Sequence, residues 1–313
     1  MRTVVVLEGD QTGQELLDGS LRALDANVTG VPLRLERFDL SLEARRRTAN
    51  GVMRDAATAM RTAGLGIKAA TITPETKGDV GSLNAIVREL FDGSVILRVG
   101  RRLPGVRPVG QASAPIAVVR TATGDACNAR EARQGAPGSL DEVATREDRV
   151  TRRTCRAVAE FSSLYAARHG TTVYGGPKWT VSPVYEGILK EEMDRAVAQH
   201  AAVPNQPDLI DAVDAHLVNL HGEPLGIPAL NRDGGCLSDL VMQMSGMVAS
   251  SVDAVQPRLW RAGSRGDGRG TPRHRAKACG AESRQPARHP EGRRQHAQPR
   301  RDKRCHARRY CNA

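Results

Sequence analysis

The sequence predicts an α/β fold. Over the first 251 residues, short segments rich in β-branched residues alternate with amphipathic segments of helical period. Polar and glycine-containing stretches separate the two kinds of segment. With 313 residues, 40% of them hydrophobic, the chain is long enough for two domains or for one large α/β unit.

The first half of the chain opens with a β-branched strand, the turn G-D-Q-T-G-Q-E and an amphipathic helix. A glycine-containing turn at this place suits a phosphate or a ribose, although it is more often only a tight connection. Strands are predicted at residues 3–7, 32–38, 65–70, 95–99 and 115–120, and helices at residues 14–26, 56–63 and 83–91.

The second half opens with a polar, glycine-rich stretch, residues 122–148, which predicts a loop or an arm. The alternation of helical and strand-like segments then resumes. Helices are predicted at residues 149–168, 184–200 and 209–219, and strands at residues 171–174 and 224–230.

The stretch P-A-L-N-R-D-G-G-C-L-S-D, residues 228–239, predicts a strand, a turn and then a helix over residues 236–247. Asp233 and Asp239 fall where the strand ends and the helix begins. Open α/β sheets bind hard cations and anionic ligands at this place. Taken alone, the two aspartates are at least as well explained as helix caps.

The net charge of +11 is confined to one end of the chain. Residues 252–313 hold 17 Lys and Arg against 5 Asp and Glu, whereas residues 1–251 are close to neutral. After Leu259 the chain has no Leu, Ile, Val, Met or Phe, so this end predicts a disordered, Arg-rich tail. With only 3% aromatic residues, nucleic-acid binding is expected only nonspecifically, through the tail.

No stretch of the sequence predicts a membrane span or a signal peptide, because no run of 18 apolar residues occurs. The six cysteines form no C-x-x-C pair and no zinc spacing, which favours reduced thiols. These features together predict a cytoplasmic protein without a membrane partner.

Three arginines mark the middle of the chain. Arg88 lies on a helical face, and Arg98 and Arg120 lie at strand ends. A guanidinium binds a carboxylate through two parallel hydrogen bonds, so three converging arginines would suit a di- or tricarboxylate. Any one of them alone is better explained as a solvated surface residue.

Several of these segments resemble the isocitrate/isopropylmalate dehydrogenase family, the β-decarboxylating dehydrogenases. Gly9, Asp10, Gly13 and Glu15 match the opening G-D-x-x-G-x-E of that family, and residues 73–90 resemble its substrate loop and helix. The resemblance covers about residues 1–251. Within it, the family's substrate-binding residues fall on Ser82, Asn84, Arg88, Arg98 and Arg120, in the S-x-N-x-x-x-R pattern of the isocitrate type, and a cofactor-binding residue falls on Thr73.

The same resemblance implies a catalytic lysine, a metal and a nicotinamide. Lys178 precedes Gly187 by the family's spacing and is the implied catalytic lysine. Asp211 and Asp239 fall on two of the three aspartates that hold Mg²⁺ or Mn²⁺ in the family. The implied cofactor is NAD or NADP, the implied substrate is a small hydroxy polycarboxylate, and the implied assembly is a homodimer in which the lysine and one aspartate reach the site from the neighbouring subunit.

Three departures from the family predict impaired activity. Gly235 stands where the family has its third metal-binding aspartate, and Cys127 stands where it has a catalytic tyrosine. The tail replaces the family's adenosine-binding segment. Codons permitted for residues 263–286 can be re-read one nucleotide later as a sequence containing H-G-T-A-P-K-L-A-G, the missing motif, so we interpret the tail as the product of a frameshift near residues 251–257.

The sequence therefore predicts an isopropylmalate-dehydrogenase-like two-domain fold whose first domain is incomplete. Residues 1–98 and 236–251 would form the cofactor-side domain, residues 99–235 the substrate and dimerisation domain, and residues 252–313 the tail. The expected function is NAD(P)-dependent oxidative decarboxylation of isocitrate or a related 2-hydroxy acid in the tricarboxylic acid cycle, impaired in this chain. The alternatives are a non-catalytic subunit and a protein that binds polyanions through its tail.

Overall fold

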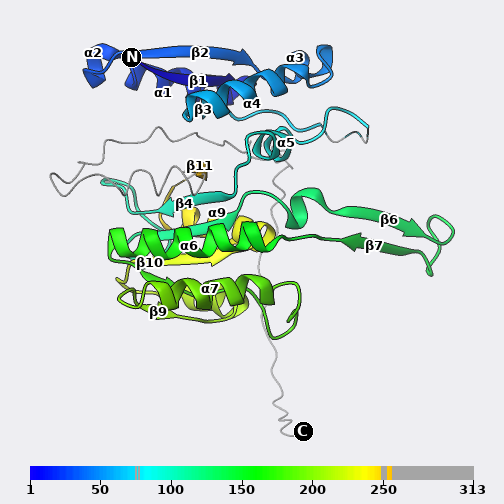
Figure 1. Ribbon diagram of the computed structural model, residues 1–313, viewed down its shortest axis with the longest axis vertical. Coiled ribbons are helices and arrows are strands. Elements are labelled where there is room, and N and C mark those ends of the chain that lie inside the picture. Colours follow the sequence, from blue (N-terminus) through cyan, green and yellow to red (C-terminus); the bar gives the residue numbers. More distant parts are fainter. Residues whose placement is uncertain (75, 77, 248–251, 256–313) are drawn as a thin grey trace, which may run out of the picture. The chain divides into compact units, whose positions relative to one another are not determined.

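The computed structural model describes residues 1–74, 76, 78–247 and 252–255. Its architecture confirms the α/β prediction (Figure 1). The tail beyond residue 255, with its frameshift interpretation, lies outside the described residues. Residues 252–255, which the sequence analysis assigned to the tail, form strand β11 (Val252–Val255), because they pair antiparallel with strand β4 (Val95–Gly100).

The N-terminal residues form a parallel three-stranded sheet in the order β2-β1-β3. Alternate residues of β1 bury both faces of this sheet: Val4 and Val6 pack with Leu17, whereas Val5 and Leu7 pack with Leu83. The strands are β1 (Arg2–Glu8), β2 (Leu33–Asp39) and β3 (Gly66–Lys68), and the helices are α1 (Gln11–Ala23), α2 (Ala26–Thr29), α3 (Leu42–Arg47), α4 (Gly51–Ala63) and α5 (Leu83–Leu90).

A second, mixed sheet has the strand order β11-β4-β5-β10-β8-β9. Strands β4 and β5 (Ile116–Thr121) are antiparallel, whereas β5, β10 (Leu225–Ala229), β8 (Thr172–Tyr174) and β9 (Asn205–Gln206) are parallel. Both faces of this sheet are covered, so β5 and β10 are buried at every position.

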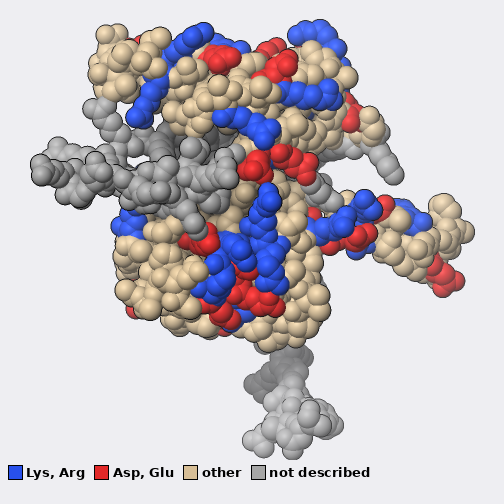
Figure 2. All heavy atoms as spheres, viewed as in Figure 1, with Lys and Arg blue, Asp and Glu red and all other residues tan. Residues whose placement is uncertain are grey.

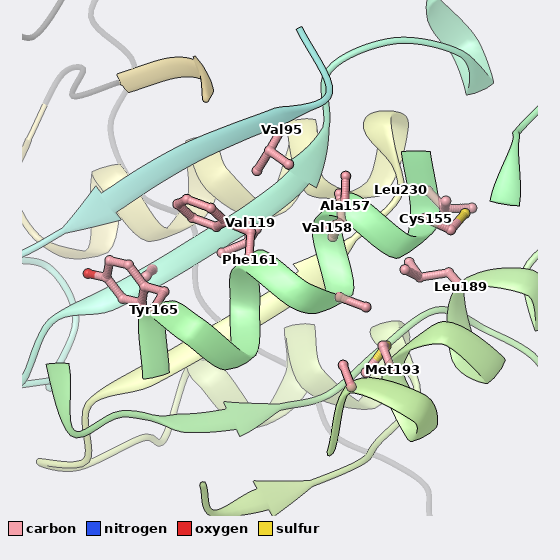
Figure 3. Close-up of a cluster of buried hydrophobic side chains, with 13 residues drawn as sticks. Val95, Val119, Cys155, Ala157, Val158, Phe161, Tyr165, Leu189, Met193 and Leu230 are labelled. Carbon is pink, nitrogen blue, oxygen red and sulfur yellow. The ribbon is translucent and has the colours of Figure 1, made fainter. Parts of the chain in front are cut away.

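Helices cover the two faces of the second sheet. Val119 of β5 packs with Val158 and Phe161 of α6 (Arg152–His169), and α7 (Gly187–Gln199) adds Leu189 and Met193 to the same cluster (Figure 3). Val118 faces the other way and packs with residues of α8 (Ile210–Leu217) and α9 (Asn231–Met244). The predicted domain boundary after residue 98 falls within β4. Strands β4 and β5 belong to this one sheet, and α9 contacts both of them. The division into two domains stays a prediction.

The polar stretch 122–148 contains a short 3₁₀ helix, η1 (Asp125–Asn128), followed by a hairpin of β6 (Arg130–Gln134) and β7 (Val143–Glu147). Of the two predictions for this stretch, the arm is confirmed and the plain loop is wrong (Figure 1). Every residue of both strands is exposed. The hydrophobic period that marks half-buried strands is therefore missing from the sequence, which is why these strands were not predicted.

None of the helices in the described ranges is long and apolar enough to cross a membrane.

An ion-pair network joins α6 to α7, where basic and acidic side chains intermingle on the surface (Figure 2). The buried carboxylate of Glu192 accepts hydrogen bonds from Arg152, Arg156 and Arg195 at 2.8–3.1 Å. These bonds, that from Arg156 first, lower the pKa of Glu192 to about 2. Because the folded state favours the ionised form, the stabilisation is present above the unfolded pKa and is lost as the pH falls through the folded value.

Replacing Glu192 by glutamine is therefore expected to lower the free energy of unfolding by about 2 kcal/mol at neutral pH, because the charge that the three arginines share is removed. The difference between the two chains should shrink below about pH 4 and vanish near about pH 2. Urea denaturation of both chains across this range measures it. A difference that does not change with pH would contradict the assignment.

Candidate functional site

Two of the predicted substrate arginines lie side by side on the second sheet. In the antiparallel register of β4 and β5, Arg98 pairs with Val118 and Arg120 pairs with Ile96. The two arginines are therefore diagonal neighbours on one face, the face that Val118 turns toward α9. Each is only 9% exposed. Burying two guanidinium groups is costly unless anionic or polar groups surround them, so this face is built around charge.

Helix α9 supplies the groups that hold these arginines. Arg98 Nη1 donates to Asp239 Oδ1 at 2.8 Å and to Ser238 Oγ at 3.4 Å. Arg120 Nη1 donates to the carbonyl oxygen of Asn231 at 2.9 Å. Positions 231, 235, 238 and 239 share one side of the helix, so one helical face meets both arginines.

The predicted turn at Asn231 to Gly235 is wrong, because α9 begins at Asn231, directly after β10. The two glycines are helical and serve a close approach. A Cβ added at Gly234 would lie 2.6 Å from the Cβ of Arg120, and one added at Gly235 would lie 3.0 Å from its Nη1. Glycine is needed at Gly234 because the helix rests on the stem of Arg120.

The third predicted arginine, Arg88, is buried in the last turn of α5. Its charge and that of Arg120 both act on the thiol of Cys127, so the two arginines lie around that residue. Burial raises the pKa of Cys127, and the two positive charges oppose this only in part. The thiol donates to Asn231 Oδ1 at 3.1 Å, which makes Cys127 a neutral packing group.

The other predicted substrate and cofactor residues lie on or just before α5. Ser82 is the exposed N-cap residue of α5 and makes no capping hydrogen bond with its side chain. Asn84 is half-buried in the first turn, with its Oδ1 atom buried. Thr73 is exposed in the connection between β3 and α5. Their roles in binding stay predictions.

Lys178 and Asp211 form a second group. Lys178 Nζ donates to Asp211 Oδ2 at 2.7 Å, and this bond lowers the pKa of Asp211. The backbone N–H of Lys178 donates to Glu186 Oε2, which fixes the loop that carries the lysine. Burial first, and then the negative charge of Asp233, raise the pKa values of Glu186 and of Asp214. The side chain of Lys178 is therefore held by Asp211, and its backbone by Glu186.

Asp125 connects helix α9, which holds the arginines, to the segment of Tyr185 and Glu186 that contacts Lys178. It was not among the predicted site residues. Its carboxylate is buried and accepts from the hydroxyl of Tyr185 at 2.8 Å and from the backbone N–H of Arg232 at 2.7 Å. The second bond caps the first turn of α9, which has no capping side chain of its own. Its φ of +53° is an uncommon conformation that aspartate and asparagine tolerate better than other residues.

Replacing Asp125 by alanine is expected to destabilise the chain by about 2 kcal/mol, because the Arg232 N–H and the Tyr185 hydroxyl, both in part-buried hydrogen bonds, lose their acceptor. Asparagine keeps an acceptor oxygen and tolerates the positive φ, so Asp125→Asn should lose less than half as much. Thermal unfolding of both variants measures this. Equal losses in the two variants would show that charge, not capping, is the contribution of Asp125.

The opening motif has a structural role in this chain. The two carboxylate oxygens of Asp10 accept from the backbone N–H groups of Leu42 and Ile72, at 2.9 and 3.0 Å. A Cβ added at Gly9 or at Gly13 would lie 2.3 or 2.4 Å from the carbonyl oxygen of Ala70. The motif thus connects the end of β1 to two loops. This is the tight connection that the sequence analysis gave as the more common explanation of such a turn.

The described residues of one chain form no preformed cluster for a divalent metal. Asp239 binds Arg98, Asp211 binds Lys178, and Gly235 brings no ligand. Within residues 1–247, apart from the two positions not described, no three His, Cys, Asp or Glu side chains lie close enough together to hold a metal ion. Mg²⁺ takes six oxygen ligands, of which one or two can be protein carboxylates and the others water or substrate oxygens, so Asp211 and Asp239 are the residues that would hold it.

Comparison with known proteins agrees with this geometry. The profile of the isocitrate/isopropylmalate dehydrogenase family matches residues 3–253. The mitochondrial NADP isocitrate dehydrogenase of Saccharomyces cerevisiae is 34% identical over 280 residues, covering 77% of this chain and 64% of that protein. NADP isocitrate dehydrogenase 1 of Mycobacterium tuberculosis is 27% identical over 254 residues, covering 67% and 60%. The chain thus spans only about 60% of the length of such relatives.

Solved structures share the fold. Isocitrate dehydrogenase from Methylococcus capsulatus superimposes with a TM-score of 0.71 at 17% identity, covering 82% of this chain and 75% of that one. The enzyme from Ostreococcus tauri, solved with isocitrate and magnesium(II), gives 0.66 at 21% identity, covering 80% and 73%. With the family profile matched across four-fifths of its length, the chain belongs to the isocitrate/isopropylmalate dehydrogenase family.

Proposed function

We propose that this chain binds isocitrate or a related hydroxy polycarboxylate between α5, β4, β5 and α9. The observation that carries the proposal is the pair of buried arginines, Arg98 and Arg120, on one face under α9. Arg88 adds a third positive charge near Cys127. A guanidinium carries five N–H donors, so it can bind a protein carbonyl or carboxylate and a ligand carboxylate together.

The reaction we propose for this lineage is oxidative decarboxylation with NAD or NADP, and we propose that this chain performs it poorly. A nicotinamide accepts the hydride when it is bound. Lys178, held by Asp211 at 2.7 Å, is the group proposed to take the hydroxyl proton. Loss of carbon dioxide leaves an enolate that needs electrostatic stabilisation. A divalent ion would supply it, and Asp211 and Asp239 would hold that ion, with Gly235 in place of a third carboxylate.

The test is an assay of the purified chain with isocitrate, Mn²⁺ and either nicotinamide, followed by reduced-nicotinamide absorbance. We expect turnover close to background, and a measurable rise in a variant that combines Gly235→Asp with the restored reading frame of the tail. Turnover at the rate of an intact relative would contradict the proposed impairment. The nucleotide sequence of residues 251–286 tests the frameshift separately, since codons that forbid the shifted reading would exclude it.

We also propose that two copies of the chain form a dimer through the hairpin β6–β7. An isolated hairpin is marginally stable, and this one leaves Leu140 and Val143 exposed. A second copy would cover them. Light scattering should give twice the mass of one chain, and Leu140→Glu with Val143→Glu should reduce it. A monomer before mutation would contradict the dimer.

The location we propose is the cytoplasm, and the cysteines support it. Cys127, Cys155 and Cys236, the cysteines that fall within the described ranges, are free thiols.

A further inference from the structure

Arg45 of α3 is a fully buried arginine that lies outside the arginine pair on the second sheet. Its relative exposure is 0%, although its side chain is charged. Burial lowers the pKa of Arg45, and the negative charges of Asp10 and Asp79 oppose that shift. Burying a guanidinium is costly unless its N–H groups are bonded, so the bonds that it makes indicate its role.

Among the described residues, the guanidinium of Arg45 joins three backbone segments. Nε donates to the carbonyl oxygen of Leu40, directly after β2, at 3.2 Å. Nη2 donates to the carbonyl oxygen of Ile72, and Nη1 donates to that of Gly81 at 3.5 Å. Ile72 and Gly81 lie near the two ends of the connection between β3 and α5. One planar group with donors in a fixed arrangement thus holds both ends at once.

The two carbonyl groups at these ends adjoin predicted ligand-binding residues. The peptide bond after Ile72 leads to Thr73, the predicted cofactor residue. The peptide bond after Gly81 leads to Ser82, a predicted substrate residue and the N-cap of α5. Because a peptide unit is planar, fixing its oxygen also fixes the nitrogen of the residue that follows. Arg45 therefore constrains where the backbones of Thr73 and Ser82 lie relative to each other.

Two neighbours of Arg45 in the sequence hold the same connection close to Gly81. Asn50 Nδ2 donates to the carbonyl oxygen of Val80 at 2.9 Å. Arg46 forms an ion pair with Asp79, and this pair lies at the surface, where such pairs contribute little. The buried bonds of Arg45, with that of Asn50, are therefore the contacts expected to fix the connection.

We propose that Arg45 is a positioning residue for the ligand site, because its bonds to Ile72 and Gly81 keep Thr73 and Ser82 in the arrangement that binds ligand. The proposal rests on the proposed function, since both residues belong to the predicted site. It goes further by giving a role to a buried residue that cannot touch the ligand itself. Where Arg45 no longer holds both ends, the apparent affinity falls with the fraction of chains that keep the competent arrangement.

Isothermal titration of the full chain with isocitrate in MgCl₂ tests the proposal. Arg45→Lys keeps the charge but loses the planar fork, and it should raise the dissociation constant about tenfold. The matched control is Arg47→Lys, the same change in the same helix at an exposed arginine that pairs with Glu43 at 4.0 Å. This control should bind as the unmodified chain does. A folded Arg45→Lys chain with an unchanged dissociation constant would overturn the proposal even if its melting temperature were lower, because a purely structural arginine changes stability and not affinity.

A second variant decides the matter where Arg45→Lys does not fold. Asn50 has a φ of +63°, which aspartate tolerates, but an aspartate has no donor for the carbonyl oxygen of Val80. Asn50→Asp should therefore weaken isocitrate binding about threefold. Unchanged affinity in this variant would show that the position of the connection does not set binding, and would overturn the proposal.

Amide hydrogen exchange of the chain without ligand separates this proposal from the proposed function. The N–H of Ile72 is bonded to Asp10, and its exchange should be about tenfold faster in Arg45→Lys and unchanged in Arg47→Lys. Equal exchange in Arg45→Lys and the unmodified chain would overturn the role of Arg45. Failure of the folded, unmodified chain to bind isocitrate would instead refute the proposed function.

Discussion

Replacing Gly13 by alanine is expected to lower the free energy of unfolding by about 3 kcal/mol, although the change adds a single methyl group to a helix. The added Cβ would lie 2.4 Å from the carbonyl oxygen of Ala70 and 2.9 Å from its carbonyl carbon. Both are backbone atoms, so no side chain can rotate away. The end of β1, the start of α1 and the connection after β3 would all have to move apart.

The same helix provides a matched control. Gly19 also lies in α1, but a Cβ there would meet only the flexible end of Arg22, at 3.7 Å. Because alanine favours the helix over glycine, Gly19→Ala should be neutral or stabilise the chain by up to about 1 kcal/mol. Urea denaturation of both variants distinguishes them. Equal stabilities would show that the opening glycines are not required by packing.

Replacing Arg120 by lysine is expected to weaken isocitrate binding about 100-fold, or by about 2.7 kcal/mol. Lysine keeps the charge but loses the planar guanidinium, which binds a carboxylate through two parallel hydrogen bonds. Arg120 also donates to the carbonyl oxygen of Asn231 at 2.9 Å, and a lysine can keep this single bond. The loss should therefore appear in binding more than in folding.

Calorimetric titration measures this effect, and circular dichroism checks that the variant is folded. Arg133 of the exposed hairpin serves as the control, because Arg133→Lys changes the same chemistry far from β5 and should leave binding unchanged. A folded Arg120→Lys chain that binds isocitrate as tightly as the unmodified chain would mean that the ligand lies elsewhere.

Hydrophobic periodicity was enough to place most of the helices and strands. The successive apolar residues of β1, β5 and β10 are typical of strands that are buried on both faces. The helical spacing of Leu83 and Val87 indicated the buried face of α5. The strands β6 and β7 bury nothing, so their sequence carries no such period. The pairing between them is set by backbone hydrogen bonds, which any residue but proline can make.

The site was harder to predict because it depends on contacts between distant residues. The sequence placed Arg98 and Arg120 at strand ends, but only the register of β4 and β5 puts them on one face. Gly234 was interpreted as a turn residue, because the sequence alone does not distinguish a glycine that permits close packing from a glycine that permits a turn. Asp125 was missed because nothing nearby in the chain foretells that it caps α9.

The most direct test of the arginine site is a crystal structure of the full chain grown with isocitrate. The account predicts density for the ligand with its carboxylates against the guanidinium groups of Arg98 and Arg120, and with Arg88 within reach. Density for isocitrate against any other part of the chain, with no ligand atom in contact with these arginines, would contradict it.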